Sequence, residues 1–437
     1  MNFSQSSSQT VSPIHRTVLN NGIVVLVKEN PVADIVSARL FVRAGSRWEQ
    51  SHQAGLSHLV SAVLTKGTAQ SSSLEIAERV ESVGASLGTD STTDYFLLSL
   101  KTVSSDFAAI LNLAGELLRS PTFPEQELEL ERRLTLQAIR SQQEQPFTIA
   151  FDQLRRKMYG QHPYALSGLG TEEAVAQLTQ HDLAHYHRTH FRPDNLIVSL
   201  SGRIDLDRAI DLVTEALGDW QSPATPLPTL DLSPVLPHPA SIFTPQETQQ
   251  SIVMLGYLTP AVHPSLAPET AIADYAALKL LNSYLGNGLS SRLFVELREK
   301  RGLAYEVSAF YPTRLETAQF VVYMGTAPDN TRIALEGLQA EVDRLSALPL
   351  ELEELQGAKN KLLGQYALGK QTNAQIAQAY GWYETLNLGI GFDGEFQQQV
   401  ASLTADQLQQ AAQRYLTQPY VSVVGPSSAI ELLTSPD

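Results

Sequence analysis

Residues 55–68 read GLSHLVSAVLTKGT, an apolar helical pattern that is closed by a lysine and a glycine. A helix can hold a divalent metal through two histidines four residues apart, because residues i and i+4 lie on one helical face. In such H-x-x-E-H helices a glutamate between the histidines acts as the general base. His58 takes the first position of this pattern, but Ser61 replaces the glutamate and Ala62 replaces the second histidine. The stretch therefore keeps the frame of a metal site and lacks its reactive groups.

The length and composition of the chain predict a globular protein of two domains. Its 437 residues exceed what one hydrophobic core usually organises, and 43% of them are hydrophobic, which is ample for burial. The formal net charge of −15 argues against nucleic acid and against an anionic membrane surface as partners. This charge suits basic peptides, although many proteins are acidic for solubility alone. The chain has no cysteine, which excludes disulfides and thiolate metal sites.

No segment of the sequence has the pattern of a membrane anchor or of a secretory signal. No apolar run approaches the roughly 18 residues that cross a bilayer. Residues 1–16, MNFSQSSSQTVSPIHR, lack the charged region followed by an apolar region that marks a secretory signal. We therefore expect a cytoplasmic protein without membrane contact.

Seven prolines mark the clearest boundary in the sequence. They are Pro223, Pro226, Pro228, Pro234, Pro237, Pro239 and Pro245. Proline fixes φ and removes a backbone donor, so residues 221–245 are expected to form an extended, semi-rigid linker. The sequence thus predicts an N-terminal domain at residues 1–220 and a C-terminal domain at residues 246–437. Their near-equal lengths suggest a duplicated domain.

Hydrophobic periodicity in the first part predicts strands between blocks of helices. The expected strands cover residues 22–28, 35–43, 86–89, 95–101 and 196–201. The expected helices cover residues 54–65, 73–83, 105–118, 124–143, 147–159, 179–189 and 205–217. Ser73 is expected to cap the second of these helices, which ends at Gly84, and Pro124 suits the first position of the fourth.

The second part repeats this order more loosely. Its expected strands cover residues 250–258, 304–311, 317–325 and 420–424. Its expected helices cover residues 268–285, 291–300, 328–346, 350–370, 372–387 and 404–416. Strands grouped between blocks of helices predict the α+β class, with a mostly antiparallel sheet flanked by helices in each of two similar domains.

Several motifs in a fixed order resemble the pitrilysin/insulinase family of inverted-motif zinc metallopeptidases. The frame of residues 55–68, GL-x-H-L followed by L-x-KGT, carries the first part of this resemblance. The other motifs are HPY at 162–164, GTEE at 170–173, the segment 186–195, and LSSRLFVELREKRGLAYEV at 289–307. The resemblance spans essentially the whole chain and points to the two-subunit branch, which includes the mitochondrial processing peptidase. It implies the fold of that branch and a non-catalytic subunit with a degenerate zinc motif.

The resemblance also identifies where the remaining metal ligand would lie. In the family a third ligand, a glutamate, follows the second histidine by 76 residues, and counting 76 residues from Ala62 leads to Ala138. A second family glutamate, two helical turns before that ligand, is matched by Glu131, which is present. Two of three ligands and the general base are therefore missing.

One imidazole does not make a zinc site. Structural sites draw about 10–16 kcal/mol from a full ligand set, and loss of a general base lowers a rate by about a hundred- to ten-thousandfold. His181 and His185 lie four residues apart on an expected helix and have acceptable ligand spacing, but a solvated helix face explains them more simply. The chain is thus expected to bind no metal or other cofactor and to be no enzyme on its own, and the resemblance implies that zinc lies in a partner subunit.

The second part of the chain keeps the residues that the family uses near its substrate. In the family, an arginine and a tyrosine seven residues apart reach from that domain into the zinc chamber, and Arg298 and Tyr305 match them. A guanidinium and a phenol are donors that can hold a peptide carbonyl or stabilise an oxyanion. The alternative is that Arg298 belongs to a solvated run of charges and that Tyr305 is a buried strand aromatic. Gly286 and Gly288 lie in a loop just before, which is shorter than the substrate-touching loop of the family's non-catalytic subunit.

Two functional hypotheses remain open from the sequence. The first is a non-catalytic, substrate-binding subunit of a heterodimeric zinc endopeptidase, which supplies Arg298 and Tyr305 to the active site of a catalytic homologue. The second is a homo-oligomeric structural or peptide-binding protein of the same fold without a peptidase partner. The expected partners are therefore a catalytic homologue or a second copy of the chain, together with a peptide substrate.

Overall fold

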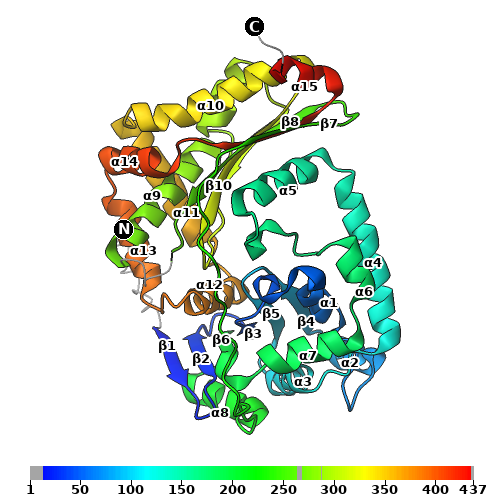
Figure 1. Cartoon of the computed structure of the whole chain (residues 1–437). Helices are drawn as coiled ribbons and strands as arrows, with labels where there is room; N and C mark the ends of the chain where they lie inside the picture. Colours follow the sequence, from blue (N-terminus) through cyan, green and yellow to red (C-terminus); the bar gives the residue numbers. More distant parts are fainter. Residues whose placement is uncertain (1–12, 263–267, 287, 435–437) are drawn as a thin grey trace, which may run out of the picture.

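The computed structural model describes residues 13–262, 268–286 and 288–434, and it contains two β-sheets with helices packed on both (Figure 1). The N-terminal half forms a sheet of six strands in the order β1-β2-β6-β3-β5-β4. Its strands are β1 Ile14–Val18, β2 Val24–Glu29, β3 Ile35–Val42, β4 Ser86–Ser91, β5 Phe96–Val103 and β6 Leu196–Gly202. Its helices are α1 Leu56–Val63, α2 Ser73–Glu81, α3 Phe107–Arg119, α4 Glu125–Gln143, α5 Pro146–Tyr159, α6 Glu172–Gln177, α7 Gln180–His190 and α8 Leu206–Leu217.

The C-terminal half forms a sheet of five strands in the order β7-β11-β8-β10-β9. Its strands are β7 Ser241–Pro245, β8 Ser251–Thr259, β9 Glu306–Phe310, β10 Ala318–Thr326 and β11 Tyr420–Gly425. Its helices are α9 Pro268–Gly286, the π-helix η6 Phe294–Lys300, α10 Thr331–Ala347, α11 Leu352–Leu368, α12 Asn373–Thr385, α13 Phe392–Ser402, α14 Ala405–Tyr415 and α15 Ser427–Thr434.

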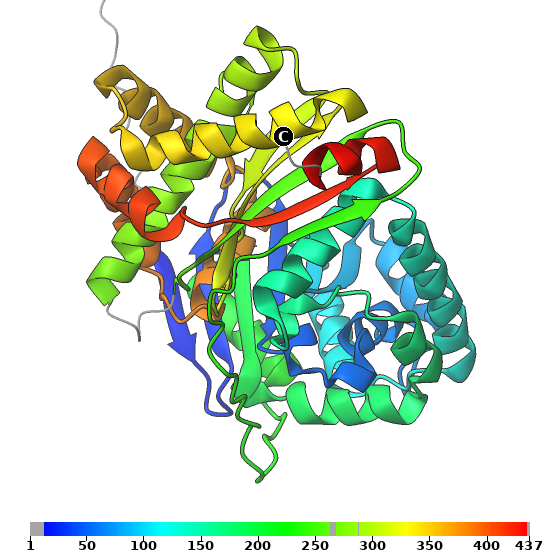
Figure 2. The ribbon, with the colours of Figure 1, turned by 45° about the horizontal axis from the view of Figure 1, so that its top comes forward.

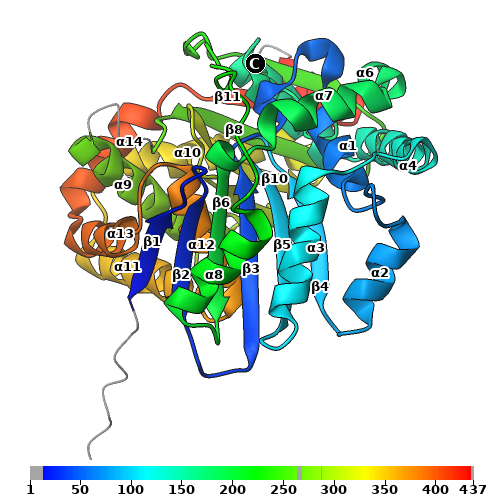
Figure 3. The ribbon, with the colours of Figure 1, turned by 90° about the horizontal axis from the view of Figure 1, so that it is seen from below.

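The two sheets repeat one topology. In the first sheet β2 and β6 are parallel and the neighbours that follow, β3, β5 and β4, are antiparallel. In the second sheet β7 and β11 are parallel and β8, β10 and β9 follow in the same antiparallel order. Strand β1 is an addition at the edge of the first sheet (Figure 3). The predicted α+β class with two similar, mostly antiparallel halves is therefore confirmed.

Each half sends one helix across to the sheet of the other half. Helix α5 packs on β8 and β11, and helix α12 packs on β3 and β6 (Figures 1 and 2). Helices α3 and α8 cover the opposite face of the first sheet (Figure 3). Both faces of each sheet are thereby buried, which explains why β6 and β8 are almost wholly buried along their length.

Two glycines allow the exchanged helices to approach the sheets closely. A Cβ on Gly381 of α12 would lie 2.2 Å from Cε2 of Phe41 on β3, and a Cβ on Gly256 of β8 would lie 2.6 Å from Sδ of Met158 on α5. A side chain at either position would overlap these side-chain atoms and would force them to move. The close approach of each helix to its sheet therefore depends on a glycine, which has no Cβ, at the point of contact.

Polar contacts also join the two halves. Arg16 donates from Nη2 and Nε to the two carboxylate oxygens of Glu384 on α12, at 2.8 and 3.0 Å, and the Glu384 side chain is only 7% exposed. This bidentate geometry is among the stronger forms of a hydrogen-bonded ion pair. At the start of α12, the Nδ2 of Asn373 donates to the Ile35 carbonyl at 3.1 Å, and its Oδ1 accepts from Asn30 at 2.7 Å.

The proline-rich segment follows the surface of the molecule. Residues 221–240 are all described, and none belongs to a helix or strand. Arg192 donates to the carbonyl of Thr225 at 2.8 Å, and the backbone N–H of His238 donates to the hydroxyl of Tyr420 at 2.6 Å. The last five residues of the expected linker are not free of the sheet, because they form β7 beside β11.

The structure corrects several details of the expected elements. The N-cap of α2 is Ser72 and not Ser73, because the Ser72 side chain accepts from Glu75 in a capping box. Pro124 is the N-cap of α4 and not its first residue. Hydrophobic periodicity did not predict the short or exposed elements β1, β7, α6, α13 and α15. Residues 1–12 and residue 287 of the short glycine loop lie outside the described residues.

A helix must be long and apolar to cross a bilayer. Within the described ranges, every helix is too short or too polar to do so.

Substitution of Gly381 by alanine tests the close approach of α12 to β3. We expect Gly381→Ala to lower the free energy of unfolding by about 1–3 kcal/mol, because the added methyl group overlaps the ring of Phe41. Thermal and urea unfolding would measure this loss. Gly364→Ala on α11 is the matched control, since a Cβ there meets nothing within 4 Å. The control should be unchanged or more stable by about 0.5–1 kcal/mol.

Candidate functional site

Helix α1, which carries His58, is held at its N-terminus by a buried carboxylate. The Glu49 side chain accepts hydrogen bonds from the backbone N–H groups of Gly55 at 2.8 Å and of Ser57 at 2.7 Å. Negative groups are favourable at this end of a helix. Burial nevertheless raises the pKa of Glu49 to about 7, and the two hydrogen bonds act in the opposite direction.

Two of the sequence motifs meet at the start of α1. Gly55 has φ of 99°, and a Cβ on it would lie 2.6 Å from the carbonyl oxygen of Leu169. Gly170 of the GTEE motif has φ of 85°, and a Cβ on it would lie 2.1 Å from the carbonyl oxygen of Ala54. Both positions therefore require glycine, because the two backbones touch. This contact fixes where α1 begins.

The degenerate metal positions lie on α1 and α4, two helices that pack against each other. His58 is half-buried, and burial lowers its pKa against the opposing effect of the nearby carboxylates Glu131 and Asp90. Ser61 is buried, and its carbonyl accepts from the hydroxyl of Thr89 on β4 at 2.7 Å. His58 thus lies on a helix that packs against both α4 and β4, where burial favours the neutral form of its imidazole.

The remaining positions of this site do not supply metal ligands. Ala62 and Ala138 are half-buried methyl groups. Glu131 forms an ion pair with Lys66, whose Nζ lies 3.0 Å from its Oε1. The carboxylate thus already has a cation beside it, and that cation belongs to the KGT end of the opening motif. Across the described part of the chain, no group of three or more His, Cys, Asp or Glu residues is arranged to hold a metal.

The histidines of α7 do not complete such a site. His181 and His185 are exposed, with ring centroids 6.4 Å apart. His187 and His190 are buried in the same helix, and burial lowers the pKa of each to about 4. The Nε2 of His187 lies 2.9 Å from the Leu118 carbonyl oxygen, which gives this ring a structural partner.

Arg298 lies on a π-helix. The expected helix at 291–300 is present, but Phe294–Lys300 has π geometry, a rare form that occurs frequently at functional sites. Arg298 is exposed, and its guanidinium carbon lies 4.9 Å from the ring centroid of Phe294. The exposure alone also fits the alternative of a solvated charge run.

Tyr305 lies directly before β9 and points outward. Its side chain is 65% exposed, so it is not the buried strand aromatic of the alternative interpretation. Its backbone N–H donates to the Gly325 carbonyl on β10 at 2.9 Å, which fixes the position of the residue. Neither the guanidinium of Arg298 nor the hydroxyl of Tyr305 has a hydrogen-bond or ion-pair partner among the described residues.

The short glycine loop before the π-helix is tied to the sheet. Gly286 ends α9, and a Cβ on it would lie 2.0 Å from the backbone nitrogen of Ala309 on β9. The Ser308 hydroxyl donates to the Gly286 carbonyl at 2.7 Å. Gly288 has φ of 86°, in the left-handed region that favours glycine. The glycines therefore serve the packing of this loop.

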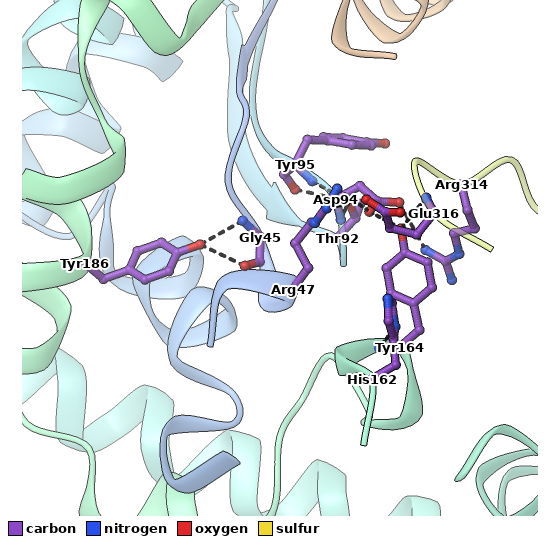
Figure 4. Close-up of polar contacts among 10 residues, drawn as sticks. All are labelled: Gly45, Arg47, Thr92, Asp94, Tyr95, His162, Tyr164, Tyr186, Arg314 and Glu316. Atoms are coloured by element: carbon purple, nitrogen blue, oxygen red, sulfur yellow. Dashed lines mark hydrogen bonds and ion pairs between the residues drawn. The ribbon is translucent and has the colours of Figure 1, made fainter. Parts of the chain in front are cut away.

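A buried acidic residue that sequence patterns did not reveal joins the two halves (Figure 4). Asp94, in the turn between β4 and β5, is 2% exposed and accepts from the Tyr164 hydroxyl at 2.5 Å. Its carboxylate oxygens lie 3.8 Å from Arg47 and 3.8 Å from Arg314, and Arg47 also pairs with Glu316 at 2.8 Å. Burial raises the pKa of Asp94 against the opposing effect of Arg314 and the other partners. The HPY motif was the available signal, because it contains Tyr164.

Another motif residue acts beside this cluster. The Tyr186 hydroxyl accepts from the N–H of Gly45 at 2.7 Å and donates to the Gly45 carbonyl at 3.0 Å (Figure 4). Gly45 has φ of 134° and precedes the turn that carries Arg47. Tyr186 thus holds the backbone from which Arg47 reaches Asp94.

Family models match both halves of the chain. Residues 24–172 match the model described as Insulinase (Peptidase family M16). Residues 177–362 match the model described as Peptidase M16 inactive domain.

Bacterial proteins are similar to the chain over most of their length. The chain is 26% identical over 368 residues to "Uncharacterized zinc protease YmxG" of Bacillus subtilis, covering 84% of this chain and 87% of that protein. It is 26% identical over 429 residues to "Uncharacterized zinc protease SCO5738" of Streptomyces coelicolor, covering 95% and 90%.

Solved structures have the same fold. A peptidase M16 inactive domain protein from Pseudomonas fluorescens superposes with a TM-score of 0.87 at 25% identity, covering 95% of this chain and 98% of that one. A protease from Helicobacter pylori superposes with a TM-score of 0.88 at 21% identity, covering 95% and 100%.

The residues present do not fit the zinc that the names of these relatives imply. A catalytic zinc needs three protein ligands and an open position. Here the positions of the other two ligands are the alanines Ala62 and Ala138, and Glu131 is paired with Lys66. No step of catalysis can be derived through a metal at this place.

Restoring the missing groups tests this conclusion. We expect the triple variant Ser61→Glu, Ala62→His, Ala138→Glu to retain about one zinc per chain after dialysis, because it regains three ligands. The unsubstituted chain and the single variant Ala62→His should retain none. Elemental analysis by mass spectrometry would measure the zinc, and stoichiometric zinc in the unsubstituted chain would contradict the assignment.

The raised pKa of Glu49 predicts a pH-dependent stability. A carboxyl whose pKa rises from 4.5 to about 7 on folding stabilises the protein when protonated. This contribution is complete below pH 4.5 and is lost as the pH rises through 7. In Glu49→Gln, this part of the pH dependence, about 2–3 kcal/mol, should disappear. Unfolding measured from pH 4.5 to 8 would show parallel curves for both proteins if the prediction is wrong.

Proposed function

This chain belongs to peptidase family M16, the insulinase family, and from that membership we propose that it is a non-catalytic, substrate-binding subunit of a two-chain zinc endopeptidase. A catalytic homologue would provide the zinc, its ligands and the general base. This chain would contribute Arg298 and Tyr305 to the chamber between the two subunits. The proposal includes no catalysis by this chain on its own.

One contrast carries the proposal. The half that would bind zinc has lost two ligands and the base, whereas Arg298 and Tyr305 are present, exposed and without a hydrogen-bond or ion-pair partner among the described residues. Two side chains whose hydrogen-bond donors are unused, one of them stacked on Phe294, suit a ligand from outside the chain. The loss in one half and the retention in the other are what a division of labour between subunits would produce.

The chemistry of the two side chains suits a peptide bond under attack. A guanidinium presents several N–H donors in a planar fork, and a phenol presents one O–H donor. Donors placed where negative charge develops on a carbonyl oxygen stabilise the transition state more than the ground state. Arg298 and Tyr305 would act in this way on a peptide that is held at the zinc of the partner.

An open strand edge offers a place for the peptide backbone. Strand β4 is the last strand of its sheet and pairs with β5 along one side only. A Cβ on Gly88 of β4 would meet nothing within 4 Å, so its face is open. An extended peptide could add to such an edge through main-chain hydrogen bonds. This edge lies beside α1, which packs against β4.

A second function is also supported by the lost metal site. A homo-oligomeric structural or peptide-binding protein of the same fold would have no use for zinc. It would have no use for Arg298 and Tyr305 in catalysis either, and their exposure favours the first proposal. Size-exclusion chromatography with mass detection, on the chain alone and mixed with a catalytic homologue, would separate the two.

Substitution of the two donors tests the proposed role. In a mixture with a catalytic homologue, Arg298→Ala and Tyr305→Phe should each lower the kcat for peptide cleavage, by about a hundred- to a thousandfold where the lost donor contacts the oxyanion. Lys300→Ala is the matched control, because Lys300 is an exposed cation of the same π-helix that pairs only with Glu296 among the described residues. The control should cleave at the unaltered rate.

The same experiment has a clear negative outcome. If the catalytic homologue cleaves peptides equally well with the unsubstituted chain, with Arg298→Ala and with no added chain, the proposed subunit role is wrong. The homo-oligomeric alternative would then stand.

A further inference from the structure

The π-helix that carries Arg298 is held to the rest of its half in two ways. Its inner side presents Leu293 and Leu297, which are both fully buried in the core of the second half. Its polar anchor is Arg292, which lies at the start of the helix and whose side chain is 19% exposed. Apolar contact holds the helix against the core but is non-directional, so the orientation of the helix depends on the polar contacts.

Arg292 joins the π-helix to two further helices. Its Nε donates to Oε2 of Glu341 on α10 at 2.6 Å. Its Nη1 lies 3.8 Å from Oε1 of Glu354 on α11 and 3.7 Å from Oε1 of Glu296 on the π-helix itself. The planar guanidinium has its donors in fixed directions, so these contacts constrain orientation as well as distance. One arginine therefore fixes how the π-helix is turned relative to α10 and α11.

The carboxylates around Arg292 depend on it to different degrees. The hydroxyl of Tyr284 on α9 donates to Oε1 of Glu354 at 2.6 Å, and Nη2 of Arg344 lies 3.8 Å from Oε2 of the same residue. In the described part of the chain, Arg292 is the only ion-pair partner of Glu341. Burial lowers the pKa of Arg292, but the hydrogen bond with Glu341 and the other partners outweigh this effect, so the pKa is raised. Removal of the guanidinium would leave neighbouring carboxylates to repel one another across the three helices.

We infer that Arg292 is a positioning residue, which orients the π-helix and thereby places the guanidinium of Arg298 for its role in the two-chain peptidase. The inference rests on the proposed subunit role and adds a residue to it. Tyr305 takes its position from the sheet instead, because its backbone N–H donates to the Gly325 carbonyl on β10 at 2.9 Å. The two donors of the proposed site are thus held by separate parts of the structure, and only Arg298 depends on Arg292.

A double-mutant cycle in a mixture with a catalytic homologue tests the inference. Arg292→Gln should lower the kcat for peptide cleavage by about ten- to a hundredfold and leave KM nearly unchanged, because a misplacement of about 1 Å has an effect of this size. Combined with Arg298→Ala, it should cause no loss beyond that of Arg298→Ala alone, whereas combined with Tyr305→Phe the two losses should multiply. Arg292→Lys should recover most of the rate, since it keeps a cation among the carboxylates.

Arg414→Gln is the matched control for these variants. Nη1 of Arg414 lies 2.8 Å from Oδ2 of Asp274, and this ion pair joins α14 to α9 in the same half. Neither residue belongs to the π-helix, so the control should cleave at the unaltered rate. Circular dichroism would verify that each variant is folded.

A distance measurement on the full chain alone gives a second readout that needs no partner. The chain has no cysteine, so Arg298→Cys and Gly364→Cys provide two unique sites for nitroxide labels. Gly364 on α11 suits a label, because a Cβ there meets nothing within 4 Å. Pulsed electron paramagnetic resonance would measure the distribution of distances between the labels. This distribution should shift or broaden when Arg292→Gln is added, and it should stay the same when Arg414→Gln is added.

The outcomes separate this inference from the proposed subunit role. The same distance distribution with and without Arg292→Gln, or losses of rate that multiply for Arg292→Gln and Arg298→Ala, would overturn the positioning role. A loss of rate with Arg298→Ala alone would still support the subunit role in that case. Conversely, a changed distance distribution would support the positioning role of Arg292 even if the catalytic homologue ignores this chain.

Discussion

Burial of one helix from each half on the sheet of the other half is the constraint on which the rest of the structure depends. Without α5 the second sheet would expose the apolar face formed by residues such as Met254 and Val321, and without α12 the first sheet would expose Leu26 and Phe41. The hydrophobic effect therefore holds the halves in one arrangement. That arrangement places Asp94 beside Arg314.

The motif at residues 55–68 is retained without its catalytic groups because most of its residues make structural contacts. Gly55 touches the backbone of the GTEE motif, and Lys66 neutralises Glu131 between α1 and α4. Tyr164 of the HPY motif binds Asp94. The alanines at positions 62 and 138 leave these contacts intact. Catalytic groups can thus be replaced by alanine while the frame is retained for packing.

Much of the fold was predictable from periodicity, but the relation between the halves was not. Long amphipathic or alternating segments such as β3, α3 and α8 lie close to their expected bounds, because the spacing of their apolar residues indicates one buried face. Strands β1 and β7 are short and partly exposed, so they carry little pattern. Helix α12 is buried against a sheet far away in sequence, and no local spacing can identify that sheet. The degenerate positions and the exposed pair followed from motifs, whereas the role of Asp94 depends on contacts between the halves, and its signal, the HPY motif with Tyr164, lies far from it in the sequence.

The covalent connection between the halves contributes little to what keeps them together. The segment 221–240 runs along the surface without regular structure. The halves are held together by α5 and α12, each of which packs on the sheet of the other half. A chain nicked by a protease in that segment would remain one particle, and the two fragments would dissociate only on denaturation. Conversely, either half produced alone would expose one face of its sheet and the apolar side of its exchanged helix. It would aggregate through these exposed apolar surfaces.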